Sequence, residues 1–138
     1  MADSGPYGIT GGIVEYMYPG DVRSFTVDSS ASTSVVGGNM VFIFDDFKVK
    51  QTAAATNANA GVALHDAAPG ELVTVARTGI YFLKAANAIT AGSLVEAAAA
   101  GGIDVWTTSE TTTQGYIVGM ALEDIAQNAV GRVELRLG

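Results

Sequence analysis

The chain contains one histidine, His65, which is followed directly by an acidic residue, Asp66. A histidine and a carboxylate can serve a hydroxyl nucleophile as its base and orienting group. Successive residues of a strand point to opposite faces, however, so this pair is badly placed for such chemistry. A similar segment later in the chain carries Glu123 at the position of the histidine. We therefore interpret His65 as an exposed polar residue and not as a catalytic base.

Two pairs of adjacent acids, Asp45-Asp46 and Glu123-Asp124, are the other candidates for chemistry. They offer oxygen ligands for calcium, but neither lies in the spaced Asp/Asn pattern with a central glycine and a distal glutamate that an EF-hand loop requires. Paired carboxylates can also hydrolyse glycosides. The single tryptophan, Trp106, lies in a β-favouring run and is better interpreted as packing in a core or an interface. We interpret these acids as solvated loop residues.

Motifs for cofactors and metals are also missing from the sequence. The glycine pairs Gly11-Gly12 and Gly37-Gly38 lack the lysine that a phosphate-binding loop requires. Cysteine is absent, which removes disulfides, thiolate metal sites and thiol nucleophiles. We therefore expect a protein without catalytic residues, cofactor or metal.

The charge balance argues against nucleic acid as a partner. Seven basic residues face fourteen acidic ones, which gives a formal net charge of −7, and nucleic-acid binding depends on Lys and Arg to neutralise phosphates. No apolar run approaches the ~20 residues that cross a membrane, and the N-terminus lacks the basic and apolar regions of a signal peptide. We expect a soluble protein that is synthesised in the cytoplasm. Charged residues make up only 15% of the chain, which suits a surface that packs against neighbours in an assembly.

Short β-favouring runs recur along the chain, separated by Gly, Asn, Asp or Pro. From Arg132 to Leu137 polar and apolar residues alternate, which predicts a half-buried strand. Helix evidence is thin, because the alanine-rich 97–100 is too short to nucleate a helix alone. The pattern predicts an all-β fold. The predicted strands are Ile13–Tyr18, Arg23–Val27, Asn39–Phe44, Gly61–Leu64, Leu72–Arg77, Gly79–Leu83, Ser93–Glu96, Ile103–Thr107, Tyr116–Leu122 and Arg132–Leu137.

An internal duplication is the strongest signal in the sequence. Residues 61–66 (GVALHD) match residues 119–124 (GMALED), and each segment leads through an alanine-containing loop to a glycine, Gly70 or Gly131, and then to a strand. This alignment makes the two loops differ in length by three residues. Upstream of each segment a glycine turn opens an apolar strand, and another β-run precedes that turn. We predict a single β domain, 19–138, made of similar halves at about 19–77 and 78–138.

The repeated residues have physical reasons to be conserved between the halves. Gly61 and Gly119 are predicted to begin strands where a side chain would crowd a neighbouring backbone or where φ is positive. Asp66 and Asp124 start loops, where a carboxylate can accept backbone N–H bonds. Two such strand–loop–strand units are expected to close around a shared core as a small β-barrel or β-sandwich.

Residues 1–18 are predicted to form an extended N-terminal arm. The arm carries apolar side chains that could become ordered on a partner protein. A plain edge strand with a frayed terminus explains the same residues equally well. The candidate partner-binding residues are Tyr7, Ile9, Ile13, Tyr16 and Tyr18.

Residues 61–83 (GVALHDAAPGELVTVARTGIYFL) closely resemble the DUF2190 family, the capsid cement or decoration proteins of tailed bacteriophages. Further agreement comes from residues 19–22 (PGDV), 91–95 (AGSLV), 119–122 (GMAL) and 131–135 (GRVEL). These motifs consist of small residues, so their order and spacing carry the resemblance, which covers about residues 19–138.

The resemblance implies a β-barrel-like structural protein on the outer surface of the phage head. Its implied partner is the major capsid protein, and it is expected to be a homo-oligomer, with a trimer favoured, that stabilises the capsid lattice of the virion. The chain departs from the simplest family pattern in residues 1–18, 45–60 and 107–114. Two alternatives stay open: another virion β-module, such as a tail or head-fibre component, and a small hydrolase that uses its loop carboxylates.

Overall fold

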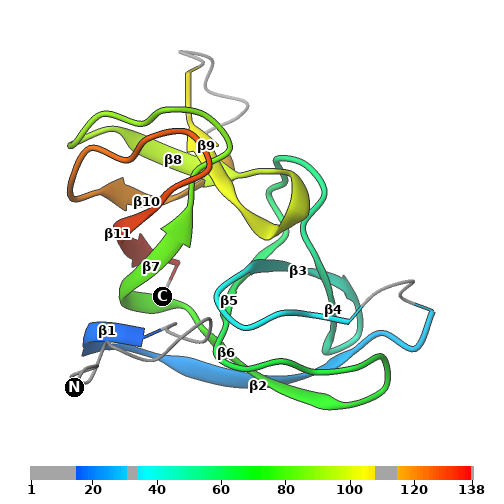
Figure 1. Ribbon diagram of the computed structural model, residues 1–138. Coiled ribbons are helices and arrows are strands. Elements are labelled where there is room, and N and C mark those ends of the chain that lie inside the picture. Colours follow the sequence, from blue (N-terminus) through cyan, green and yellow to red (C-terminus); the bar gives the residue numbers. More distant parts are fainter. Residues whose placement is uncertain (1–14, 31–33, 108–114, 138) are drawn as a thin grey trace.

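The computed structural model describes residues 15–30, 34–107 and 115–137, which form short strands, turns and short 3-10 segments (Figure 1). This confirms the all-β prediction. The strands are β1 (Glu15–Pro19), β2 (Val22–Val27), β3 (Met40–Asp45), β4 (Lys48–Gln51), β5 (Asn59–Ala63), β6 (Leu72–Ala76), β7 (Thr78–Lys84), β8 (Leu94–Ala97), β9 (Ile103–Val105), β10 (Ile117–Ala121) and β11 (Val130–Arg136), and the helix η1 (Ala99–Gly101) lies between β8 and β9.

The first half of the chain is a closed barrel with the strand order β2-β4-β3-β5-β6. Strand β2 closes it by pairing antiparallel with β6 and parallel with β4, where Val27 faces Val49. The second half belongs to a six-stranded sheet with the order β1-β7-β11-β10-β8-β9. In the second half Ala85, which follows β7, forms a single parallel bridge with Ile103 of β9. This half therefore curls into a nearly closed barrel above the first (Figure 1).

The strand registers of the two halves correspond residue by residue, which confirms the two similar halves. The pair Phe42–Lys50 between β3 and β4 has its counterpart in the pair Glu96–Asp104 between β8 and β9. The parallel pairing of β2 with β4 corresponds, in the second half, to the parallel bridge between Ala85 and Ile103. One strand of this pattern, β4, was missing from the sequence prediction, because it offers only four residues and a single buried apolar side chain.

Each half surrounds a hydrophobic cluster of its own, so the expectation of one shared core is wrong. The first cluster lies inside the closed barrel, and the second fills the curled sheet and also takes in three residues of the first half. The first cluster contains Phe25, Val27, Val35, Val41, Val49, Ala60, Ala63, Ala67, Val73 and Val75. The residues that the first half contributes to the second cluster are Met40, Val62 and Ala76.

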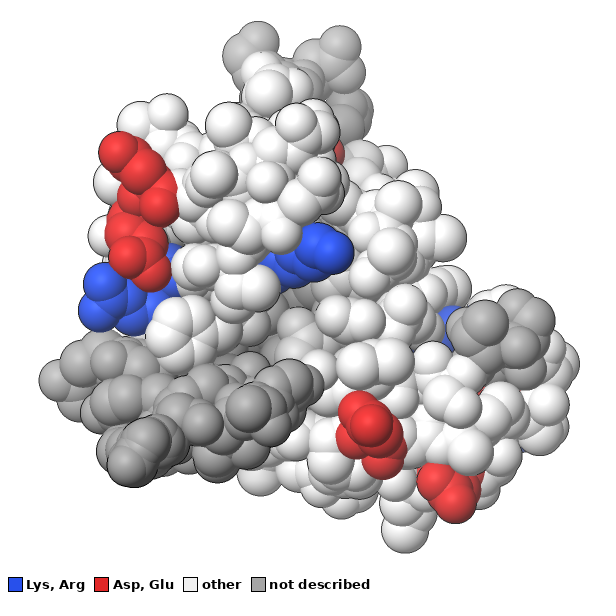
Figure 2. Space-filling view, in the orientation of Figure 1, with Lys and Arg blue, Asp and Glu red and all other residues white. Residues whose placement is uncertain are grey.

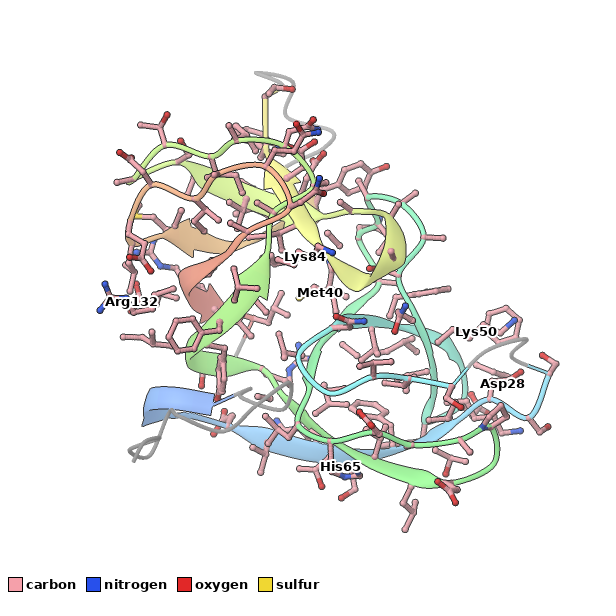
Figure 3. The ribbon with its side chains drawn as sticks, in the orientation of Figure 1. Asp28, Met40, Lys50, His65, Lys84 and Arg132 are labelled. Carbon is pink, nitrogen blue, oxygen red and sulfur yellow. The ribbon has the colours of Figure 1, made fainter. Side chains whose placement is uncertain are left out.

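The three shared residues mark the joint between the halves. Met40 is fully buried and points from the first barrel toward the second half (Figure 3). Beside it, the Thr52 hydroxyl donates to the carbonyl of Ala98 (2.9 Å), and the Gly101 N–H donates to the carbonyl of Thr52 (3.0 Å). The Arg77 guanidinium bridges the halves by donating to the carbonyl oxygens of Ala60 and Leu137, each at 2.9 Å.

The loops after the repeated segments have equal lengths, contrary to the sequence alignment. Gly70 (φ 89°) and Asn128 (φ 65°) take the same left-handed position, and their N–H groups donate to the equivalent carbonyls of Val27 and Ala85 (2.8 Å each). Gly131, which the alignment matched to Gly70, lies inside β11. The error arose because asparagine also tolerates the left-handed region and here replaces the expected glycine.

Candidate interaction surface

Strand β1 holds two of the five predicted partner-binding residues, Tyr16 and Tyr18. Tyr7, Ile9 and Ile13 lie outside the described residues. β1 pairs antiparallel with β7 and stands at one end of the six-stranded sheet, so it is an edge strand, as the alternative interpretation expected. An edge strand leaves one row of backbone donors and acceptors free for a further strand.

The link from β1 to β2 is fixed tightly against the start of β7. The Asp21 N–H donates to the Thr78 hydroxyl (2.8 Å), and the Tyr81 hydroxyl donates to the carbonyl of Thr78 (2.6 Å). A side chain at Gly20 would come within 2.0 Å of the Thr78 hydroxyl oxygen, so only glycine fits there. The link between β1 and β2 is therefore held in place by the fold.

A second surface, which the sequence interpretation missed, lies on the β3–β4 hairpin. The rings of Phe42 and Phe44 meet edge to face with centroids 6.4 Å apart, and the Lys50 ammonium lies 3.7 Å from the Phe44 ring centroid. At the hairpin tip Phe47 is 72% exposed, although its ring contacts Phe25. We call Phe42, Phe44, Phe47 and Lys50 the aromatic–lysine face. The signal that could have revealed it was the run of five large apolar residues at 40–44, longer than one buried face of a strand needs, followed by the alternating residues 47–50 (FKVK).

The hairpin carries two acids of its own, Asp45 and Asp46. Near its lysines lies a third acid, Asp28, which is almost fully buried. Its carboxylate accepts hydrogen bonds from the hydroxyl and the N–H of Ser30, the latter at 2.9 Å. The pKa of Asp28 is lowered mainly by the Ser30 hydroxyl, and Lys50 and Lys48 add smaller contributions in the same direction. Figure 3 places Asp28 and Lys50 on the same side of the first half.

The loop acids that were candidates for chemistry serve the backbone instead. Asp66 accepts from the N–H of Gly37, and Asp124 accepts from the N–H of Ala91, both at 2.8 Å. The His65 ring contacts the carbonyl oxygen of Asp66 and not its carboxylate, and its Nε2 accepts from the N–H of Thr74 (3.1 Å). The predicted role of these aspartates in holding loops is therefore confirmed, and the geometry of a catalytic His–Asp pair is not present at this site.

In the second half Glu123 replaces His65 and makes the corresponding contact more strongly. Its carboxylate accepts from the backbone N–H of Arg132 (2.8 Å) and from the guanidinium at Nε (3.0 Å) and Nη2 (2.9 Å). The Arg132 side chain, followed by its N–H, lowers the pKa of Glu123 to about 2. Both the His65 and the Glu123 contact clamp the repeated segment onto the strand beside it.

Among the residues with described positions, no three His, Asp or Glu side chains gather closely enough to hold a metal ion. The same residues include no helix that is long and apolar enough to cross a membrane. Figure 2 shows charged side chains as separate patches on a mainly uncharged face. The arrangement offers surfaces for contact and no convergent set of reactive groups among the residues described.

Comparison with known families bears on the remaining interpretations. The sequence pattern of the phage cement proteins matches residues 19–137, which is most of the chain. The chain belongs to the phage cement protein family. Membership makes it a structural phage protein and does not place it in an enzyme family. The resemblance to cement proteins noted in the sequence is thereby confirmed.

Among solved structures, this cement-family fold is similar to the N base of the head fibre protein gp8.5 of bacteriophage phi29. The TM-score is 0.61 at 19% sequence identity, and the match covers 86% of this chain and 97% of that one. At this identity the likeness shows a common fold alone. No curated protein matches the sequence.

Proposed function

We propose that this protein binds the outer surface of a phage head and stabilises the capsid lattice, with the major capsid protein as its partner. The observation that carries the proposal is the match of residues 19–137 to the phage cement family. The small fraction of charged side chains, 15%, also suits a protein that packs against neighbours. We further propose that it acts as a homo-oligomer, with a trimer favoured, because several linked copies hold a lattice more tightly than one.

The test is a binding assay with expanded heads of the same phage that lack this protein. We expect the purified chain to bind these heads to saturation and to raise the temperature at which they release DNA. Heads that do not bind it, or bound heads that are no more heat-stable than bare heads, would contradict the proposal. Labelled microscopy separates the fibre alternative, because a tail or head-fibre component would be found on those structures and not across the head lattice.

The N-terminal segment is our candidate for the capsid contact. Deletion of residues 1–14 removes Tyr7, Ile9 and Ile13 and leaves β1 in place. We expect the shortened chain to melt as the full chain does and to bind heads about tenfold more weakly, a loss of ~1.4 kcal/mol. A matched variant keeps the full length and replaces only these three residues by serine. Unchanged affinity in both proteins would eliminate the anchor role.

A further inference from the structure

The outer faces of the two halves have the same backbone and opposite chemistry. On β3–β4 the cross-strand pair is Phe42 and Lys50, whereas the equivalent pair on β8–β9 is Glu96 and Asp104. Equivalent positions of a duplicated unit therefore carry an aromatic–cationic pair in one half and two acids in the other. Such an inversion indicates that the two faces meet different surroundings.

Lys50 of the aromatic–lysine face lies beside exposed apolar surface, whereas Lys48 has Asp45 opposite it in the strand register. Phe44 is 49% exposed although it is a large apolar side chain. Neither Lys48 nor Lys50 forms an ion pair with another residue of the described segments; Lys50 rests on the Phe44 ring instead. A cation held over an aromatic ring and beside exposed apolar surface suits a partner that is both acidic and apolar.

Among the described residues, no cation forms an ion pair with the acidic face on β8–β9. Glu96 and Asp104 lie directly opposite each other on antiparallel strands, where like charges are destabilising. Burial, and then the negative charge of Asp104, raise the pKa of Glu96. The Asn87 amide donates to Asp104 (2.9 Å) but brings no charge. A lysine supplied from outside would relieve this repulsion.

Apolar surface adjoins the acids on the same face. Leu94 lies two residues before Glu96 in β8, on the same side of the strand, and is half-buried. Its counterpart in the first half, Met40, is fully buried because the second half covers it. The equivalent position is therefore an interface residue within the chain in one half and remains partly open in the other.

We propose that the aromatic–lysine face of one copy packs against the Leu94, Glu96 and Asp104 face of the next copy. The contact rests on the proposed homo-oligomer and specifies its surfaces. The two faces lie on different halves, with β4 in the lower right of Figure 1 and β9 near the top, so the contact is head-to-tail. A head-to-tail contact that closes on itself makes a ring.

The test is the solution mass of the full chain by light scattering, together with a charge swap. We expect the wild-type chain to be an oligomer, and Lys50→Glu and Glu96→Lys each to reduce the mass to that of one chain, 14.1 kDa. The double variant should restore the oligomer, because the two charges then attract again with reversed signs. Phe44→Ser, which changes an exposed residue, should also give single chains. Circular dichroism confirms that every variant is folded.

Arg23→Glu provides the matched control, because it makes the same charge reversal at an exposed position of β2 and should leave the mass unchanged. A wild-type chain of 14.1 kDa, oligomers that persist in both single variants, or a double variant that stays single would each overturn the contact. Binding of heads is measured separately with the wild-type chain. Head binding by a single chain would overturn this contact and the homo-oligomer but leave capsid binding standing. An oligomer that does not bind heads would leave the contact standing and overturn capsid binding.

Discussion

The two halves of the molecule share their backbone and differ in how they close and in what they expose. The first half closes through two parallel pairs between β2 and β4, whereas the second closes through the single bridge of Ala85 with Ile103. Part of the outer face of the first half is buried at the joint between the halves, whereas the equivalent face of the second half is partly exposed. The comparison teaches that the repeated residues maintain the fold, while the positions that changed give the two outer faces different chemistry.

The largest loss of stability is expected from substituting the two repeated glycines, Gly61 and Gly119. An added Cβ would lie 2.0 Å from the carbonyl oxygen of Ala76 at Gly61, and 2.0 Å from that of Glu134 at Gly119. Both glycines lie within strands and not at their starts, as the sequence had suggested. We expect Gly61→Ala and Gly119→Ala each to lower the free energy of unfolding by about 3 kcal/mol, because the backbone has to move to remove the clash.

Chemical denaturation measures both variants. Gly92→Ala is the control, because φ is 86° there but a Cβ would meet no atom within 4 Å. It should cost only about 1 kcal/mol, the usual effect of placing a side chain in the left-handed region. A loss at Gly119 as small as that at Gly92 would show that the close approach is not what requires glycine.

The joint between the halves is tested by Met40→Ala. Removal of this fully buried side chain leaves a cavity between the two halves and should cost about 2–3 kcal/mol. The equivalent change in the second half, Leu94→Ala, should cost less, because Leu94 is half-buried. If 19–138 is a single domain, calorimetry will show one transition that shifts as a whole. Two separate transitions would mean that each half melts by itself.

The clamp of Glu123 predicts that the stability of the chain falls at acid pH. The pKa of Glu123 is about 2 in the folded chain, below its ordinary value of 4.5. The unfolded chain therefore binds the proton first, so the contribution of this carboxylate is complete above pH 4.5 and is lost as the pH falls toward 2. Partial exposure limits the contribution to about 1 kcal/mol.

Glu123→Gln should reduce the loss of stability between pH 5 and pH 2, which acid titration followed by circular dichroism measures. Glu134→Gln is the matched control, because Glu134 pairs with Arg136 on an exposed surface. A titration curve for Glu123→Gln that coincides with that of the wild type would show that the clamp adds no stability.

The smallest effects are expected at the two equivalent loop aspartates. Asp66→Asn and Asp124→Asn keep an oxygen that can accept from Gly37 and Ala91, respectively, so each should cost less than about 1 kcal/mol. The two losses should be equal within error. A hydrolase activity that disappears in either variant would favour the enzyme alternative over a structural role.

Several features could be predicted from the sequence because they depend on short segments. Alternation in 132–137 gave strand β11, and the repeated GxAL segments gave the two similar halves. Gly61, Gly119, Asp66 and Asp124 were assigned backbone roles that their contacts confirm. Such roles can be read from short sequence patterns. A close approach to a neighbouring backbone permits only glycine, and a capped loop favours a residue with a short polar side chain.

Other features depended on pairings between distant parts of the chain. Strand β4 is short and polar, and its identity follows only from its partners β2 and β3. The separate cores likewise depend on which strands close each barrel. Those pairings are hydrogen bonds between strands that lie far apart in the sequence. The aromatic–lysine face exists because the hairpin turn brings Lys50 over Phe44.

The sequence by itself therefore determined the all-β fold, the duplication and the family of this protein. Only the tertiary structure decided that each half closes on its own core, that β1 is an edge strand, and that equivalent outer faces carry opposite chemistry. The physical reason is that strand patterns are encoded within a few residues, whereas closure and surface composition arise from strands that are far apart in the chain.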